Sequence, residues 1–140
     1  MKLNYLKMLV LGLVFVNFSC SKDKEAEVVK PVVQITKATL VLKKTTGEVV
    51  NGITVYAYEE SKWQVTGDNP TFASGQASSD ANGNAVFSNL EYASTFTDLN
   101  NNQNNFRFSA YYTLNGVNKK KVTAITFNKG DQKTQNIILD

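Results

Sequence analysis

The chain has 140 residues, a formal net charge of +3 at pH 7, no histidine and one cysteine. This length suits one domain of ordinary size, and so small a charge argues against the concentrated basic surface of a nucleic-acid-binding protein. Without histidine, Ser-His-Asp and Cys-His catalysis are excluded, and with one cysteine there is no internal disulfide.

Residues 1–19 have the pattern of a signal peptide, with two lysines, an apolar run from Met8 to Val16, and the small residue Ser19. A membrane-spanning helix needs about 20 apolar residues, so this run is too short to be one. Cys20 follows directly, and lipidation would explain why an exported chain carries a lone cysteine. An ordinary cleaved signal that makes no use of Cys20 is the alternative.

The segment Val16–Cys20 resembles a bacterial lipobox, in which aliphatic and small residues precede the cysteine that is acylated. Loose forms of this motif are familiar in Bacteroidota. The resemblance implies that residues 1–19 are removed and that Cys20 carries the lipid that anchors the protein to a membrane. Lys2 and Lys7 would leave with the signal, so the basic balance of the full chain is partly a property of the signal.

Residues 20–31 are charged, contain no aromatic residue and show no hydrophobic period, which predicts a flexible tether. Ser21 stands where an aspartate would resemble an inner-membrane retention signal, which favours the outer membrane. The charged cluster of residues 22–25 is similar to the export signal of surface lipoproteins in Bacteroidota. A plain solvated linker is the alternative interpretation of this cluster.

Residues 32–140 alternate short β-rich segments with turns and show no helical period, which predicts an all-β domain. In the clearest strand, Ile53–Tyr58, the tyrosines lie on the face opposite Val55. Asn115-Gly116 joins the two strands of the best hairpin, because Asn-Gly supplies the positive φ angles of a tight turn. The other expected strands are residues 32–35, 39–43, 62–65, 72–77, 85–87, 92–97, 106–114, 119–127 and 134–139.

Such short strands at roughly ten-residue spacing indicate an antiparallel β-sandwich of about seven to nine strands. A parallel sheet is disfavoured because it needs helical crossovers. A closed small barrel is the alternative. In the last strand, Ile137 and Leu139 share one face, as expected for a core between two sheets.

Two turn-centred segments, Gly47–Tyr56 and Ser79–Leu90, resemble the motifs of prealbumin-like domains. This family includes the transthyretin-like and carboxypeptidase-regulatory modules and the related Cna-B-type domains. The strand 134–139 fits the last strand of the family. The resemblance implies a seven-stranded sandwich that serves as a structural or binding module and seldom as an enzyme.

Three aromatic residues, Tyr56, Tyr58 and Trp63, are the candidates for a ligand-binding surface. Exposed aromatic side chains in a row can stack on the rings of a glycan or form a protein interface. The alternative is that the tyrosines cover an edge of the sandwich and that Trp63 belongs to the core.

No metal site or cofactor is predicted. The segment Asp80–Asn84 has oxygen ligands at alternate positions, as calcium loops do, but the same residues are those that a hairpin turn requires. Cna-B-type domains also carry a Lys–Asn isopeptide bond, for which Lys43 or Lys44 and Asn136 are roughly placed. An exposed lysine and a strand asparagine are the ordinary interpretation. The run Lys119–Lys121 is expected to guard a sheet edge.

The sequence therefore predicts a protein that is not an enzyme. Its only acidic doublet, Glu59-Glu60, places neighbouring carboxylates on opposite faces of a strand, which does not suit a two-carboxylate glycosidase. The expected function is a lipid-anchored outer-membrane or surface module that binds a glycan or an envelope protein. The alternative is a structural spacer or an assembly subunit of a surface complex.

Overall fold

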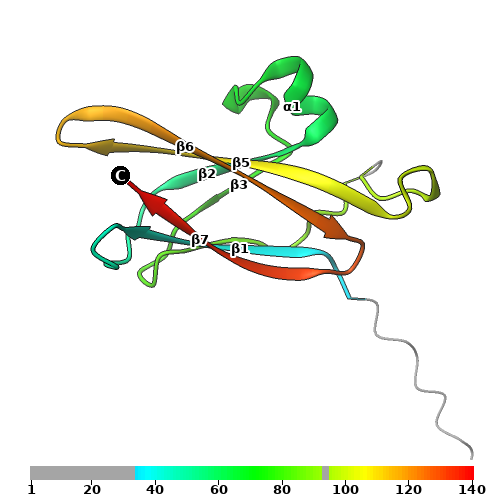
Figure 1. The fold of residues 1–140 in the computed structure, drawn as a ribbon, viewed down its shortest axis with the longest axis horizontal. Helices are drawn as coiled ribbons and strands as arrows, with labels where there is room; N and C mark the ends of the chain where they lie inside the picture. Colours follow the sequence, from blue (N-terminus) through cyan, green and yellow to red (C-terminus); the bar gives the residue numbers. More distant parts are fainter. Residues whose placement is uncertain (1–33, 93–94) are drawn as a thin grey trace, which may run out of the picture. The chain divides into compact units, whose positions relative to one another are not determined.

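The computed structural model of the protein describes residues 34–92 and 95–140. The predicted signal peptide, Cys20 and the tether of residues 20–31 lie outside this described part. The described residues form seven strands in two facing sheets, a β-sandwich (Figure 1). Among these residues, no helix has both the length and the apolar character needed to cross a membrane. The predicted fold class, an all-β sandwich, is confirmed.

The smaller sheet has the strand order β4–β1–β7 and is centred on β1 (Lys37–Lys44). On one side, β4 (Asn84–Phe87) pairs antiparallel with β1. On the other side, β7 (Gln132–Leu139) pairs parallel with β1, so that Leu42 lies opposite Ile137. This parallel pair departs from the predicted antiparallel pairing. It needs no helical crossover because the whole second sheet lies between the first and the last strand of the chain.

The larger sheet has the strand order β3–β2–β5–β6 and is antiparallel throughout. The long strands β5 and β6 form the predicted hairpin, in which Asn115 (φ 52°) and Gly116 (φ 76°) make the tight turn. The strands are β2 (Thr54–Glu59), β3 (Gly75–Ser78), β5 (Gln103–Leu114) and β6 (Val117–Asn128).

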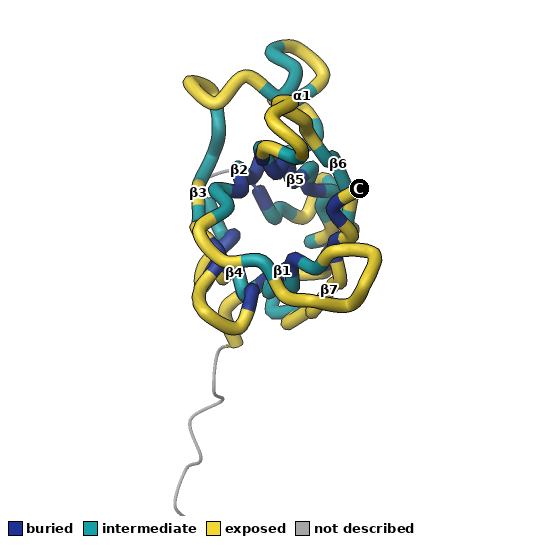
Figure 2. Tube along the Cα trace, turned by 90° about the vertical axis from the view of Figure 1, so that its left-hand side faces the viewer, coloured by how far each residue is buried: buried dark blue, intermediate teal, exposed yellow. Residues whose placement is uncertain are grey.

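The core lies between the two sheets and is built by period-two alternation along the strands. Figure 2 marks the buried positions along the trace. Three phenylalanines of the hairpin lie at its centre, all at most 1% exposed: Phe106, Phe108 and Phe127. The rings of Phe106 and Phe127 meet edge to face with centroids 5.9 Å apart. Ile137 and Leu139 are buried on one face of β7, as predicted.

The segment between β3 and β4 forms the predicted turn. One carboxylate oxygen of Asp80 accepts hydrogen bonds from the backbone N–H groups of Asn82 (2.8 Å) and Asn84 (2.9 Å). These bonds lower the pKa of Asp80. Gly83 has φ +77°, and a Cβ there would lie 2.8 Å from the Leu42 carbonyl oxygen. The oxygen-rich pattern of this segment thus serves the turn.

The strand predicted for residues 62–65 is wrong, because these residues lie in the helix α1 (Glu60–Thr66). Four residues are too few to separate a period of two from a helical period. The helix has local side-chain support: the Gln64 amide donates to Glu60 at 3.3 Å, and the Thr66 hydroxyl donates to the Lys62 carbonyl at 3.0 Å. The expectation of a domain without helices is therefore also wrong.

Three other expected strands differ from the structure. Residue 92 and residues 95–97 form no strand, because the Thr95 carbonyl accepts bonds from two asparagine side chains, at 2.9 and 2.6 Å. Of the segment 32–35, residues 34 and 35 precede β1 outside any strand, and residues 32–33 lie outside the described part. The strand expected at 72–77 begins only at Gly75, because Phe72 ends the 3₁₀ helix η1 (Pro70–Phe72).

Candidate functional site

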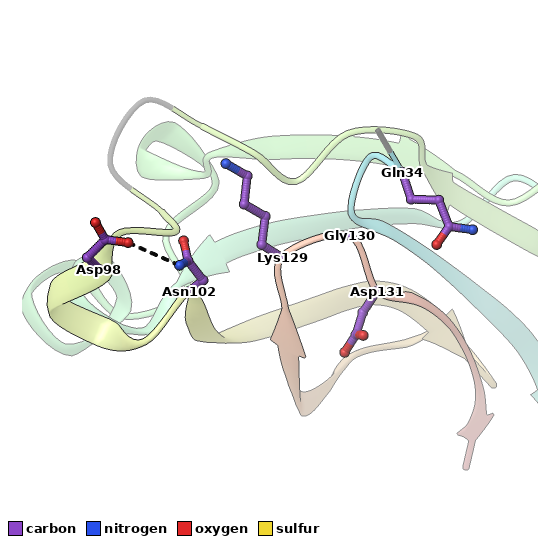
Figure 3. Close-up of a pocket in the computed structure, with 6 residues that line it drawn as sticks. All are labelled: Gln34, Asp98, Asn102, Lys129, Gly130 and Asp131. Atoms are coloured by element: carbon purple, nitrogen blue, oxygen red, sulfur yellow. Dashed lines mark hydrogen bonds between the residues drawn. The ribbon is translucent and has the colours of Figure 1, made fainter. Parts of the chain in front are cut away.

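A polar pocket of about 670 Å³ opens at the end of the sandwich where the described chain begins. We call it the end pocket. Its lining comes from the start of the described chain, the loop before β5 and the turn between β6 and β7. The lining residues are Gln34, Asp98, Asn102, Lys129, Gly130 and Asp131 (Figure 3).

The loop before β5 is shaped by its asparagines. It contains the 3₁₀ helix η2 (Asp98–Asn100), which ends in two residues with positive φ, Asn101 at 52° and Asn102 at 55°. Asparagine adopts this left-handed conformation more readily than other residues with a Cβ. The Asn102 side chain donates to the Asp98 carboxylate at 3.3 Å, which brings these two lining groups together (Figure 3).

The turn after β6 is held against the start of β1. The Gly130 N–H donates to the Thr36 hydroxyl at 2.7 Å, and the Lys37 N–H donates to the Asp131 carbonyl at 2.8 Å. The Lys129 N–H donates to the Asn102 carbonyl at 2.8 Å, so the turn and the loop before β5 are fastened to each other. The backbone of the end pocket is thus fixed from three segments.

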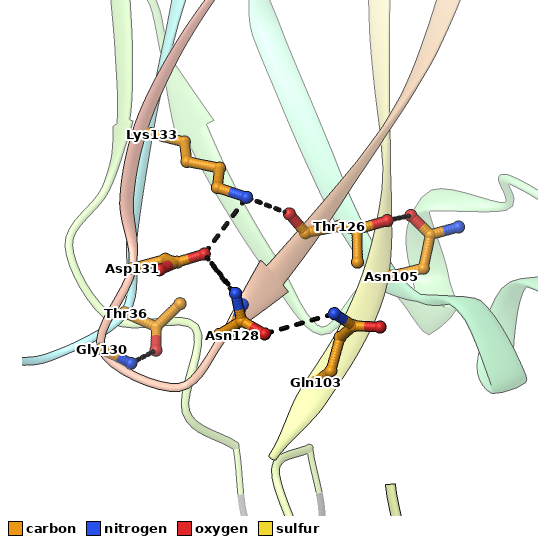
Figure 4. A network of polar contacts seen from close by, with 8 residues as sticks. All are labelled: Thr36, Gln103, Asn105, Thr126, Asn128, Gly130, Asp131 and Lys133. Atoms are coloured by element: carbon orange, nitrogen blue, oxygen red, sulfur yellow. Dashed lines mark hydrogen bonds and ion pairs between the residues drawn. The ribbon is translucent and has the colours of Figure 1, made fainter. Parts of the chain in front are cut away.

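Asp131, one of the lining residues, is the centre of a polar network (Figure 4). One of its carboxylate oxygens accepts from the Asn128 N–H at 2.9 Å and from the Lys133 ammonium at 3.1 Å. These contacts lower the pKa of Asp131, the backbone bond from Asn128 most of all. Asp131 is therefore an ionised acceptor at neutral pH.

A second carboxylate, Glu91, fastens the same end of the sandwich. It accepts hydrogen bonds from the N–H of the buried Thr36 at 2.8 Å and from its hydroxyl at 2.9 Å. These bonds lower the pKa of Glu91, and the nearby Lys129 adds to the effect. Because Thr36 also accepts from Gly130, Glu91 stabilises the turn that lines the pocket.

The chemistry of the end pocket is that of hydrogen bonding. It combines the carboxylates of Asp98 and Asp131, two side-chain amides and the ammonium of Lys129, with no aromatic ring. Across residues 34–92 and 95–140, no cluster of three Asp, Glu, His or Cys side chains could hold a metal ion. Such a lining suits a ligand rich in hydroxyl groups, because carboxylates and amides accept and donate to them directly.

The predicted aromatic candidates, Tyr56, Tyr58 and Trp63, do not form an open row. Tyr58 is 0% exposed, so its ring is not part of the open surface of this structure. Tyr56 packs edge to face on Tyr111, with ring centroids 5.8 Å apart. Trp63 lies on α1, and the guanidinium of Arg107 covers its ring at 4.5 Å from the centroid.

Residues 60–72, which we call the strap, comprise α1, with Trp63 on it, and η1. The strap lies over the face of β2 and β5 that carries Tyr58. Glu60 of the strap accepts two hydrogen bonds from the guanidinium of Arg107 on β5, at 2.7 and 3.0 Å. Hydrogen bonding to Arg107 is the main reason that the pKa of Glu60 is lowered. Asp68 forms an ion pair with Lys120 of β6, and its carbonyl accepts from the Tyr111 hydroxyl. Glu60 of the acidic doublet is therefore neutralised by an arginine.

The lysines of the run Lys119–Lys121 lie on β6, the outermost strand of its sheet, as predicted. Lys120 pairs with Asp68, and Lys121 pairs with Asp140 at 3.0 Å. The predicted isopeptide partners lie on adjacent strands of the smaller sheet, and Asn136 is exposed there.

Sequence analysis did not single out the lining of the end pocket, although the loop before β5 and the turn after β6 each fall between two strands that it expected. The signal was available in the hairpin. Counting equal numbers of residues outward from Asn115-Gly116 places Gln103 opposite Asn128, which is the observed register. The loop before Gln103 and the turn after Asn128 must then meet at the same end of the sheet.

No protein-family model matches the chain, and no curated protein sequence is similar to it.

Proposed function

We propose that the chain is a lipid-anchored bacterial lipoprotein whose β-sandwich is a non-catalytic binding module with its ligand site in the end pocket. The anchoring part rests on the segment from Met8 to Cys20, which has the pattern of a lipoprotein signal. The outer membrane, with display at the cell surface, is the location that this proposal assigns. The binding part rests on one observation, the convergence of three polar segments around the end pocket.

The ligand we propose is a glycan. A pocket for an apolar small molecule is lined mostly by hydrophobic and aromatic side chains, whereas this one presents carboxylates, amides and an ammonium. Glycans offer many adjacent hydroxyl groups that can bond to such a lining in pairs. An envelope protein is the other partner class that the same polar groups would accept.

The state of the carboxylates supports a binding role over catalysis. A general acid at neutral pH needs a raised pKa, and the pKa of Asp131 is lowered by its hydrogen bonds. The carboxylate of Asp131 also holds the turn in place, because it accepts from the Asn128 N–H and from the Lys133 ammonium. A carboxylate so placed holds a ligand hydroxyl better than it donates a proton.

The test is a glycan array probed with residues 32–140, a segment that contains the whole described core. Asp98→Ala and Lys129→Ala should each lower the affinity for any bound glycan by about five-fold or more, because each removes a direct hydrogen-bonding group. Lys119→Ala is the matched control, since Lys119 has the same charge and lies near the opposite end of β6. Equal binding by all three variants would contradict the assignment of the site.

The anchor has its own test. Cys20→Ser should shift the protein out of the membrane fraction or leave it with its signal uncleaved, because the lipid acceptor is lost. A Cys20→Ser protein that is processed normally and stays with the membrane would refute lipidation. The glycan result does not depend on this outcome.

The second candidate is a structural spacer or assembly subunit, and a specific surface favours it. Among the described residues, the outer face of the β4–β1–β7 sheet exposes two apolar side chains, Val86 at 41% and Ile138 at 39%. Exposed apolar faces of this kind mark protein interfaces. Val86→Lys should abolish cross-linking to neighbouring envelope proteins if this function holds, and should leave glycan binding unchanged.

Family membership is also a proposal. The two segments that resemble prealbumin-like domains, residues 47–56 and 79–90, form turns followed by the strands β2 and β4. A seven-stranded sandwich is what that resemblance implies, and it supports a binding module rather than an enzyme.

A further inference from the structure

Ion pairs and hydrogen bonds join the strap to β5 and β6 through Glu60 and Asp68. α1 has seven residues and none of them is buried. Two of the apolar side chains of the strap point outward, Val65 at 86% and Phe72 at 49% exposure. A helix this short is not stable without tertiary contacts. The strap therefore depends on its latches, the ion pairs Glu60–Arg107 and Asp68–Lys120.

Both latches are accessible to solvent. The side chains of Arg107 and Glu60 are 30% and 22% exposed, and those of Lys120 and Asp68 are 44% and 21% exposed. Ion pairs of this exposure are weakened by salt. The strap is thus closed by interactions of modest strength.

The surface under the strap is unlike the core. Three polar atoms are buried with no hydrogen-bond partner among the described residues: the hydroxyls of Tyr58 and Ser109 on the strands, and the indole nitrogen of Trp63 on the strap. Tyr58 and Ser109 are both 0% exposed. On the strands, Tyr56 lies opposite Ser109 and Tyr58 lies opposite Arg107, so these side chains are neighbours on one face. Unpaired buried polar groups are unfavourable and rare in native structures.

We infer that the outer face of β2 and β5 is a second carbohydrate-binding site, which the strap closes and which opens when its latches part. Tyr56 and Tyr58 of β2 supply ring faces for stacking on pyranose rings, and Trp63 supplies another from the strap. The unpaired hydroxyls and the indole N–H supply the hydrogen bonds that sugar hydroxyl groups complete. This site is separate from the end pocket and stands on different residues.

The test uses the full chain, purified in a detergent without sugar head groups. In Glu60→Gln/Lys120→Met both latches are broken, and Arg107, which covers the Trp63 ring, is kept. Trp63 is the only tryptophan, so quenching of its fluorescence by acrylamide reports opening. Quenching should increase about two-fold relative to the wild type. Lys44→Met/Lys121→Met is the matched control, because it removes two lysines from surface ion pairs outside the strap.

Binding is then measured by calorimetry with cellohexaose, maltohexaose and xylohexaose. At least one should bind the latch variant about ten-fold more tightly than the wild type, because opening no longer opposes binding. Adding Tyr56→Ala should remove this gain. A variant with exposed Trp63 that binds none of the three, or an unchanged affinity after Tyr56→Ala, would overturn the inference.

Two further measurements keep the result unambiguous. Adding Asp98→Ala/Lys129→Ala should leave the gain intact; loss of the gain would assign the binding to the end pocket and overturn the second site. If the latch variant does not fold, the wild type is compared at 0.05 and 0.5 M NaCl. Higher salt should increase acrylamide quenching of Trp63, and unchanged quenching would refute the opening of the strap.

Discussion

The two faces of the β3–β2–β5–β6 sheet are covered in different ways. On the inner face, Phe106 and Phe108 of β5 pack against the opposite sheet and are at most 1% exposed. On the outer face, the intervening Arg107 and Ser109 lie under the strap, where a charged group makes the main contact. One strand therefore takes part in an apolar, fully packed layer and in a polar layer that contains unpaired groups.

The difference between the two faces indicates which of them contributes most to the stability of the domain. Burial of apolar surface contributes about 25 cal/mol per Å² and is insensitive to salt, whereas a partly exposed ion pair contributes about 0–1 kcal/mol. The inner face should thus set the global stability. The outer face can change its cover without unfolding the domain, which is what a functional surface requires.

The largest expected effect comes from the inner face. Phe106→Ala should lower the free energy of unfolding by about 3–5 kcal/mol, because it leaves a cavity in the centre of the aromatic cluster. Urea denaturation of residues 32–140 measures this. Phe72→Ala is the control on the strap, and since Phe72 is 49% exposed the change there should stay within about 0.5 kcal/mol. Similar losses in both variants would break the distinction between the two faces.

A smaller effect is expected at the polar end, where groups are buried but paired. Glu91→Ala should lower the free energy of unfolding by about 1–3 kcal/mol at pH 7, because the N–H and the hydroxyl of the fully buried Thr36 lose the carboxylate that accepts from them. Thermal or urea unfolding measures the loss. Glu48→Ala, which breaks the exposed pair with Lys44, should cost at most about 0.5 kcal/mol.

The pH dependence of the same pair of proteins sharpens this prediction. The pKa of Glu91 in the folded state is lowered from its ordinary value of 4.5, so folding favours the ionised carboxylate. Its contribution is fully present above pH 4.5 and is lost as the pH falls through the folded-state pKa. The stability difference between wild type and Glu91→Ala should therefore shrink on acidification. A difference that is constant from pH 7 to pH 3 would contradict the ionic origin.

The features that sequence could predict are those set by short-range rules. The period of Ile53–Tyr58 identified β2, the pair Asn115-Gly116 identified the hairpin, and Asp80–Asn84 identified a turn. In each case the residues act on their own backbone or on a neighbouring strand. The sandwich followed from these signals because alternating strands without helical crossovers have few ways to bury one face.

The features that sequence missed depend on contacts between distant segments. The α1 helix was read as a strand because Lys62–Val65 fits both periods, and Arg107 of β5 provides the salt bridge that holds the helix. The burial of Tyr58 could not be predicted from its strand, since the strap that covers it follows in the chain and turns back. The end pocket depends on the register of the hairpin, which brings the loop before β5 and the turn after β6 to the same end of the sheet.

The smallest expected effect is also the most direct comparison of the two layers. Tyr58→Phe removes a buried hydroxyl that has no partner among the described residues, so the free energy of unfolding should stay unchanged or rise by up to about 1 kcal/mol. Tyr112→Phe removes a hydroxyl that donates to the Asp140 carbonyl at 2.8 Å, and should cost about 0.5–1.5 kcal/mol. Chemical denaturation measures both changes, and of the two variants only Tyr112→Phe should lose stability. A clear loss of stability in Tyr58→Phe would mean that its hydroxyl is paired in solution, and the surface under the strap would then be satisfied in the way that the core is.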